Sequence, residues 1–249
     1  MYLRILVLGS MLLFIYGIPA HADTHAQVFL DGIKHYDARE HEKAAALFEK
    51  LAADGIHNGK LYYNIGNTYL KQDKLGLAML WYERAHRLIP GDPDLNFNMD
   101  YARSLLKDEP GTLNSPVFKV IFFWKDMCST VVWQWIGIIA GMLFWCFFAC
   151  TYFFRKRVLM PFIYFFLCVA LLSSGTAVYF FNESIFHSRA IVLDKVVSVR
   201  SGFSSETTEL FVLHEGTLVA VEKQMNGYLK IRYDKNKIGW VSDKMAEII

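Results

Sequence analysis

Residues 129–154 read STVVWQWIGIIAGMLFWCFFACTYFF, and residues 158–181 read VLMPFIYFFLCVALLSSGTAVYFF. Neither run contains Asp, Glu, Lys or Arg, and each exceeds the roughly 20 residues that a helix needs to cross a bilayer. The two runs therefore predict a hairpin of two transmembrane helices. The alternative is a buried helical hairpin of a soluble core, which two such lengths side by side disfavour.

The connector between the two runs consists of Arg155, Lys156 and Arg157. Lys and Arg are concentrated in the cytoplasmic loops of membrane proteins. The connector is therefore predicted to be a cytoplasmic loop. Both flanking segments, which carry the two large domains, are then expected on the opposite side of the membrane.

The first residues of the chain support the same topology. Arg4 precedes an apolar run over 5–18, and Pro19 and the small-residue pattern Ala20-His21-Ala22 follow it. This order predicts a secretory signal peptide over residues 1–22. If the segment is retained as an anchor instead of being cleaved, the domain after it is still exported.

A spacing of 34 residues recurs between residues 27 and 90, in a helical pattern. The residue types at these positions resemble those of tetratricopeptide repeats, in which a small residue on each helix permits a close crossing and an aromatic fills the adjacent gap. We expect a tetratricopeptide domain over 23–108, with repeats at about 25–58 and 59–92 and a capping helix at 93–108. The matched positions are Gly32 and Gly66, Ala44 and Ala78, Phe48 and Tyr82, and Ile56 and Pro90.

The first helices of the two repeats would line the concave face of such a domain. Aromatic side chains there suit an extended or helical peptide, Asn67 can hydrogen-bond a ligand backbone, and Lys71 can pair with an acidic group. The same residues can instead belong to the core of the domain. The predicted binding residues on this face are Phe29, Ile33, Tyr36, Tyr63, Asn67, Leu70 and Lys71.

Residues 109–128 are expected to connect the repeats to the first membrane helix. The segment contains Pro and Gly, then an apolar stretch over 117–124 that ends in Phe122, Phe123 and Trp124. Aromatic side chains favour the interface between lipid and water. An interfacial helix is therefore predicted just outside the first span.

The last 60 residues have a different pattern of short, β-branched segments between polar turns, at 190–192, 196–200, 217–221, 228–231 and 238–241. Five strands of this length predict a small β-barrel. With Gly239-Trp240-Val241 near its end, the region 187–249 resembles a bacterial SH3-like domain. That resemblance implies a ligand cleft for a peptide or a cell-wall fragment at Tyr228 and Trp240, although Tyr228 replaces the Trp often found in the family. A purely structural use of both aromatics is the alternative.

Composition and residue spacing exclude several function classes. The net charge of +2 shows no bias toward nucleic acid. No metal-ligand pairing, phosphate-binding loop or nucleophile elbow is present, so neither an enzyme nor a metal or other cofactor is expected. Cys146 and Cys150 lie one helical turn apart inside the first span and favour packing, with a soft metal as the alternative.

The order of the modules resembles BatE-type proteins of bacterial aerotolerance (Bat) operons. This resemblance covers the mature chain and includes the stretch Asp94-Leu95-Asn96-Phe97-Asn98-Met99 and the turn His214-Glu215-Gly216. The expected fold is multidomain: an α-helical tetratricopeptide solenoid, a two-helix transmembrane hairpin and a small SH3-like β-barrel. The family implies the inner membrane of Gram-negative bacteria, with both large domains in the periplasm beside von Willebrand A-domain partner proteins.

Two functions from different classes follow from these features. The first is a membrane-anchored periplasmic scaffold that assembles a Bat-type stress complex through its repeats. The second is an envelope sensor or peptidoglycan-binding module that acts through the SH3-like domain.

Overall fold

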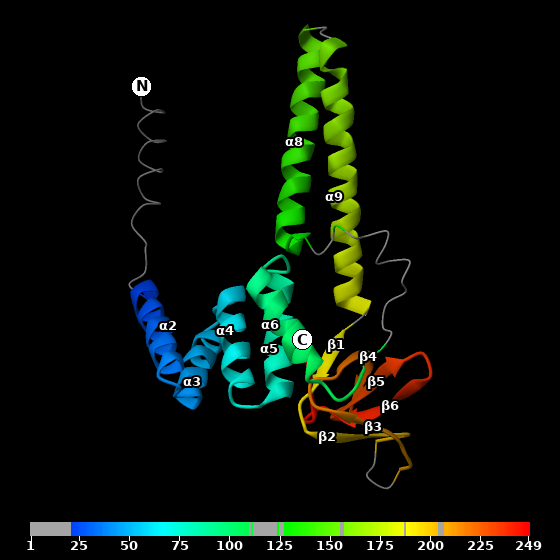
Figure 1. Ribbon diagram of the computed structural model, residues 1–249. Coiled ribbons are helices and arrows are strands. Elements are labelled where there is room, and N and C mark those ends of the chain that lie inside the picture. Colours follow the sequence, from blue (N-terminus) through cyan, green and yellow to red (C-terminus); the bar gives the residue numbers. More distant parts are fainter. Residues whose placement is uncertain are drawn as a thin grey trace, which may run out of the picture. The chain divides into compact units, whose positions relative to one another are not determined.

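The computed structural model describes residues 21–109, 111, 124, 127–154, 157–186, 188–203 and 207–249 (Figure 1). These residues form helices and one antiparallel sheet, and the chain divides into two compact units, Met1–His57 and Asn58–Ile249. Three predictions fall mainly outside the described residues: the signal peptide, the interfacial helix apart from Trp124, and the two connector residues Arg155 and Lys156.

The first unit contains a helical hairpin of α2 (His21–Asp37) and α3 (His41–Ala53). A Cβ placed on Gly32 would lie 2.5 Å from Cε1 of Phe48, so the close crossing of the two helices requires glycine at this position. Phe48 is fully buried. Phe48 therefore fills the space that the missing side chain of Gly32 leaves between the helices.

The second unit begins with α4 (Gly59–Leu70), α5 (Leu75–Leu88) and α6 (Pro93–Ser104). A Cβ placed on Gly66 would lie 2.5 Å from Cδ1 of Tyr82, which is also fully buried. The contact between glycine and aromatic ring thus recurs in the second hairpin. The close crossings predicted from the 34-residue spacing are confirmed in both hairpins.

Side chains that cap two of these helices fix where they begin. Asn58 Oδ1 accepts hydrogen bonds from the backbone N–H groups of Lys60 at 2.8 Å and Leu61 at 3.2 Å, which starts α4. Asp92 Oδ1 accepts one from the N–H of Leu95 at 3.1 Å, and Pro93 occupies the first turn of α6. The capping helix predicted at 93–108 is confirmed as a helix that begins at Pro93 and ends at Ser104.

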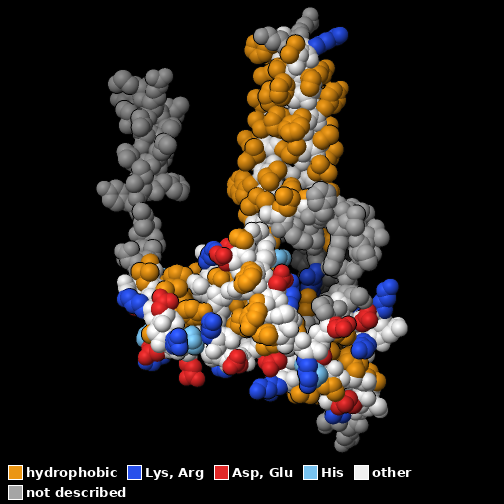
Figure 2. Space-filling view, viewed as in Figure 1, with side chains coloured by type: hydrophobic (Ala, Val, Ile, Leu, Met, Phe, Trp, Pro, Cys, Tyr) orange, Lys and Arg blue, Asp and Glu red, His pale blue; other side chains and the backbone are white. Residues whose placement is uncertain are grey.

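Two helices are long and apolar enough to cross a membrane. These are α8 (Thr130–Phe154) and the segment Arg157–Phe181, which comprises the 3-10 turn η2 (Arg157–Leu159) and most of α9 (Met160–Phe186). The mean hydropathy of their most apolar windows is 2.0 and 2.1, and only 6% and 11% of those windows is buried. A core helix of a soluble protein would be mostly buried, so this exposure favours the membrane prediction. Apolar side chains cover the visible surface of the pair (Figure 2).

The two apolar helices pack on each other through aromatic side chains. The ring of Phe147 on α8 stacks on Phe162 and Phe166 of α9, with ring centroids 5.5 Å apart in each case. Phe162 and Phe166 are four residues apart and therefore share one face of their helix. A Cβ placed on Gly137 would lie 3.2 Å from Cβ of Ser173, so the helices also approach closely where small residues meet.

The remainder of the second unit is a seven-stranded antiparallel sheet with the strand order β3-β2-β6-β5-β4-β1-β7. Its buried side includes Leu229 and Ile231 of β5 and Val241 of β6. The strands are β1 (Arg189–Val192), β2 (Val196–Arg200), β3 (Glu209–His214), β4 (Leu218–Met225), β5 (Tyr228–Asp234), β6 (Lys237–Ser242) and β7 (Ala246–Ile248).

The number of strands corrects the sequence-based prediction of five. All five predicted segments overlap strands, but β3 and β7 were missed. The strand β3 forms one edge of the sheet and buries only Leu213, so its sequence lacks the alternation of a half-buried strand. The strand β7 has three residues, which is too short for a periodic pattern.

Candidate functional site

Three of the predicted binding residues lie on α2 in the first unit. Phe29, Ile33 and Tyr36 are all partly buried. The ring of Phe29 lies 5.6 Å from that of Phe48, and the ring of Tyr36 lies 5.4 Å from that of His41. Both aromatic side chains therefore contribute to packing within their own hairpin while keeping part of their surface exposed.

Two others, Tyr63 and Asn67 on α4, belong to a polar network within the second unit. Asn67 Oδ1 accepts hydrogen bonds from Tyr82 Oη at 2.7 Å and from Asn98 Nδ2 at 2.9 Å. Asn98 Nδ2 also donates to Tyr63 Oη at 2.9 Å. The side-chain oxygen of Asn67 thus joins α4, α5 and α6, and the binding of a ligand by this residue stays a prediction.

The last two residues of this set lie at the C-terminal end of α4. Leu70 is partly buried, and Lys71 is exposed. The Lys71 ammonium can therefore still meet an acidic ligand group, as the sequence predicted. Within the second unit, these two residues together with Tyr63 remain as candidate contacts for a partner.

Three aromatic side chains gather on the sheet, and we call Phe203, Tyr228 and Trp240 the aromatic patch. The ring centroid of Phe203 lies 4.2 Å from that of Trp240 and 6.1 Å from that of Tyr228. Tyr228 and Trp240 are partly buried, and Phe203 is 38% exposed. Sequence reasoning identified Tyr228 and Trp240 but missed Phe203, whose only signal was an aromatic residue in a polar turn.

Basic side chains lie beside the aromatic patch on the neighbouring strands. Both Arg200 of β2 and Lys230 of β5 stand opposite Trp240 in the register of the sheet. Lys230 is paired with Glu222 of β4 at 3.1 Å, and Arg200 Nη1 donates to the carbonyl oxygen of Thr207 at 2.7 Å. The exposed parts of the three rings can stack on a ring or a proline of a ligand. The charged groups of Arg200 and Lys230 at the border of the patch already have partners within the sheet domain.

A second cluster joins the helices of the second unit to the sheet. Asp108, just after α6, accepts hydrogen bonds from the backbone N–H of His214 at 2.7 Å, from His214 Nδ1 at 2.8 Å and from Thr217 Oγ1 at 2.7 Å. Lys107 Nζ lies 3.3 Å from His214 Nε2, which assigns the ring proton to Nδ1 in neutral histidine. We use the name helix–sheet junction for the contacts that Asp108 and α5 make with the sheet. The residues on the helix side are Gly76, Arg84, Arg87, Lys107 and Asp108.

Backbone groups approach closely in the same junction. A Cβ placed on Gly76 of α5 would lie 2.8 Å from the carbonyl oxygen of Leu193, and the Gly76 N–H donates to Glu215 Oε2 at 3.2 Å. Gly216, with φ at +82°, packs against Leu106 and Met79. The turn His214-Glu215-Gly216 therefore rests directly on α5 and on the segment after α6.

Two arginines of α5 complete the junction. Arg84 Nη2 pairs with Glu247 Oε1 at 2.5 Å, and its guanidinium lies 4.7 Å from the ring centroid of Trp81. Arg87 Nη1 donates to the carbonyl oxygen of Ile249 at 2.8 Å. Neither pairing has a local sequence signal, because more than 160 residues separate the partners.

The electrostatics of Asp108 reflect two opposing effects. Burial alone would raise the pKa of this carboxyl group, but the hydrogen bonds from His214 and Thr217 favour the ionised form more strongly. The pKa of Asp108 is therefore lowered from its ordinary value of 3.8. The carboxylate is charged near neutral pH and holds its partners through charge-assisted hydrogen bonds.

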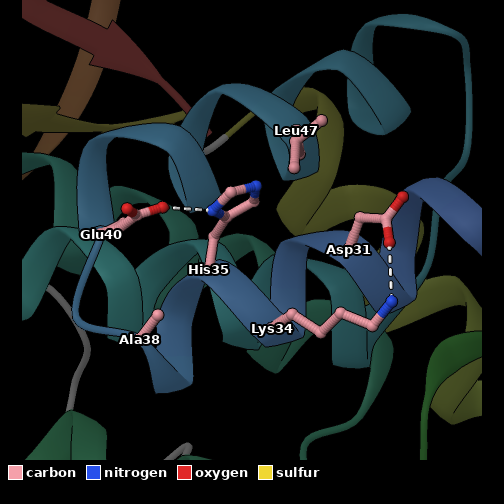
Figure 3. Close-up of a pocket in the computed structure, with 6 residues that line it drawn as sticks. All are labelled: Asp31, Lys34, His35, Ala38, Glu40 and Leu47. Atoms are coloured by element: carbon pink, nitrogen blue, oxygen red, sulfur yellow. Dashed lines mark hydrogen bonds and ion pairs between the residues drawn. The ribbon is translucent and has the colours of Figure 1, made fainter.

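An open hollow in the first unit is lined by residues of both its helices and the turn between them (Figure 3). His35 Nδ1 lies 2.5 Å from Glu40 Oε2, and Lys34 Nζ lies 3.2 Å from Asp31 Oδ1. These hydrogen bonds lower the pKa of Glu40 and of Asp31. Because its polar groups pair with one another, the hollow offers a ligand little unsatisfied hydrogen-bonding capacity.

Among the described residues, no group of three or more His, Cys, Asp or Glu side chains is arranged to hold a metal ion. The pair Cys146 and Cys150 accordingly has no further ligand among these residue types in that part of the chain. The sequence matches no protein-family model, and no curated protein is significantly similar to it. The candidate sites therefore rest on their geometry. They are the partly exposed residues of the predicted binding face on α2 and α4, the aromatic patch and the helix–sheet junction.

Proposed function

We propose that this protein is a membrane-anchored scaffold that holds partner proteins at the periplasmic face of a bacterial inner membrane. In this proposal the helical hairpins are tetratricopeptide repeats, the sheet is an SH3-like domain, and the protein is of the BatE type. Its partners are then membrane proteins with von Willebrand A domains. The lipid bilayer holds the chain through α8 and α9.

The helix–sheet junction is the observation that carries this proposal. It ties α5 and the segment after α6 to three places on the sheet: the turn at 214–217, the end of β1 and the last strand. A scaffold presents several binding surfaces in one fixed arrangement. A sensor that relays ligand occupancy between modules needs a joint with two arrangements. The extent of this junction favours the scaffold.

The two glycine–aromatic crossings support the repeat assignment. Gly32 with Phe48 and Gly66 with Tyr82 make the same contact 34 residues apart, which is the period of tetratricopeptide repeats. The family resemblance includes the stretch 94–99 and the turn 214–216, and both make contacts between elements of the second unit. The first supplies Asn98 to the network of Asn67, and the second forms the junction.

Crosslinking in intact membranes followed by affinity capture of the full chain tests the scaffold. We expect capture of a membrane protein, and we expect Lys71→Glu to weaken it because an exposed charge on the predicted binding face is reversed. Trp240→Ala is the matched control on the sheet. Equal recovery of the partner by the wild type and Lys71→Glu, with loss in Trp240→Ala, would transfer the binding site to the aromatic patch.

A second candidate function rests on the aromatic patch itself. Three clustered rings bordered by basic groups suit the stacking of a sugar ring or of a peptide of the cell wall. Sedimentation with purified peptidoglycan separates this candidate from the scaffold. Cosedimentation that is lost in Trp240→Ala would favour the wall-binding module, and its absence would leave the patch with a structural role.

A further inference from the structure

The ring of Phe203 lies against the other two rings of the aromatic patch. Its centroid is 4.2 Å from that of Trp240 and 6.1 Å from that of Tyr228. Contacting aromatic rings ordinarily have centroids about 4.5–7 Å apart, so Phe203 touches both rings and lies closest to Trp240. On β6, Trp240 alternates with the buried Gly239 and Val241, so its side chain lies on the side of the sheet away from the core. Phe203 therefore covers an outward-facing tryptophan.

The spacing of these rings leaves no room for a ligand ring between them. Carbon atoms in contact lie about 3.5–4 Å apart, so a flat group inserted between two rings needs about 7–8 Å between their centroids. The distances from Phe203 to Trp240 and to Tyr228 are both shorter than this. A ligand ring can therefore stack on Trp240 at the place of this contact only after Phe203 has moved away.

Hydrogen bonds hold the chain on both sides of Phe203. The backbone N–H of Ser201 donates to the carbonyl oxygen of Thr208 at 3.0 Å, and Arg200 Nη1 donates to the carbonyl oxygen of Thr207 at 2.7 Å. These two bonds close the base of the turn between β2 and β3. The ring of Phe203 can therefore rotate off the patch about its side-chain bonds while the base of the turn stays closed.

We propose that Phe203 is an internal competitor for the aromatic patch, which a ligand from the cell wall must displace before it stacks on Trp240. This inference rests on the second candidate function and adds regulation to it. Displacement removes the two ring contacts of Phe203, each of which favours the covered state by about two- to tenfold. The apparent affinity for the ligand falls accordingly, because only the uncovered fraction of the protein binds.

The chemistry of the covered place indicates which part of a cell-wall fragment displaces Phe203. A phenylalanine ring is flat and apolar, so the group that replaces it on Trp240 is also flat and apolar, such as one face of a sugar ring. The basic groups of Arg200 and Lys230 beside Trp240 already have partners, which disfavours recognition of a phosphate or carboxylate there. The ligand group is therefore a sugar of the glycan strand.

Binding of soluble fragments of purified peptidoglycan to the full chain in lipid nanodiscs tests this inference. Phe203→Ala should bind about three- to tenfold more tightly than the wild type, because the competitor is gone. This variant should fold, since Phe203 lies outside the buried core of the sheet. Phe203→Tyr keeps the ring and should bind as the wild type does. The control is Val196→Ala, which trims a 61% exposed side chain of β2 outside the patch and should leave binding unchanged.

A second measurement reports on the contact without any ligand. Hydroxyl-radical footprinting, read by mass spectrometry, gives the oxidation of Trp240 as a measure of its exposure. In the ligand-free protein this oxidation should rise in Phe203→Ala, because the covering ring is removed. It should stay at the wild-type level in Phe203→Tyr and in Val196→Ala.

The outcomes separate this inference from the function on which it rests. Weaker or equal binding by Phe203→Ala, compared with a wild type that binds, would make Phe203 part of the ligand site or a bystander and would overturn the inference alone. Unchanged oxidation of Trp240 in Phe203→Ala would also overturn it. If that oxidation rises but neither protein binds the fragments, the second candidate function fails and the inference fails with it.

Discussion

Replacing Asp108 with alanine tests the helix–sheet junction most directly. The change removes the acceptor of three hydrogen bonds, which the backbone N–H and the ring of His214 and the hydroxyl of Thr217 donate. Thr217 as a residue is only 3% exposed. Each buried donor left without a partner costs about 1–3 kcal/mol, so we expect the junction to lose about 2–4 kcal/mol. That loss corresponds to roughly 30- to 1000-fold less protection of the amides that open with the junction.

Hydrogen exchange measured by mass spectrometry on the full chain in lipid nanodiscs provides the readout. Peptides that cover 209–217 should exchange faster in Asp108→Ala, while peptides from α2 and α3 keep their wild-type rates. The control is Asp94→Ala, an exposed acidic residue of the first turn of α6, with an expected effect of about 0.5 kcal/mol. Unchanged exchange over 209–217 in Asp108→Ala would refute the view that Asp108 holds the sheet to the helices.

Further predictions concern acid, a glycine, an asparagine and the membrane topology. Because the pKa of Asp108 is lowered in the folded protein, its stabilising contribution is present above pH 3.8 and is lost as the pH falls below that value. The protection of 209–217, taken relative to the intrinsic exchange rate at the same pH, should therefore fall in acid in the wild type but not through this step in Asp108→Asn. Gly216→Ala should lower the melting temperature through a loss of about 2 kcal/mol, because φ is +82° and a Cβ would collide with a leucine side chain; an unchanged melting curve would contradict the close approach. Asn67→Ala should cost about 1–3 kcal/mol by removing a shared acceptor; reduced partner capture at unchanged stability would contradict this structural role and support the predicted role in binding. A reporter that works only outside the cytoplasm should be active after Ile249 and inactive at Lys156, and the reverse pattern would invert the topology.

Local patterns in the sequence predicted the parts of the fold that depend on local physics. The apolar helices follow from hydropathy alone, and the two helical crossings follow from Gly32 with Phe48 and Gly66 with Tyr82, because close approach demands a glycine wherever it occurs. The exposed apolar side of α6 was also readable, since Phe97, Tyr101 and Leu105 are spaced by four residues. The sequence analysis predicted only a capping helix there and did not single out these three residues.

Contacts between distant residues escaped the sequence analysis for a physical reason. Asp108 and His214 are 106 residues apart, and nothing near either residue indicates that they meet. The oxygen of Asn67 similarly accepts a hydrogen bond from Asn98, 31 residues later in the chain, and no local pattern near Asn67 indicates this contact. Residue type identifies what a group can do, whereas tertiary packing decides whether it is already engaged.

The helix–sheet junction also brackets the two apolar helices in the chain. The chain is tied to the sheet at Asp108, and Tyr233 Oη donates to the carbonyl oxygen of Glu109, before the chain continues toward α8. After α9 it returns at once to β1, which packs on α5. In connectivity, the two apolar helices at 130–181 are thus inserted between two segments that the junction already fastens to each other. Replacing these helices with a short flexible linker should leave a body that retains the junction and suits crystallisation.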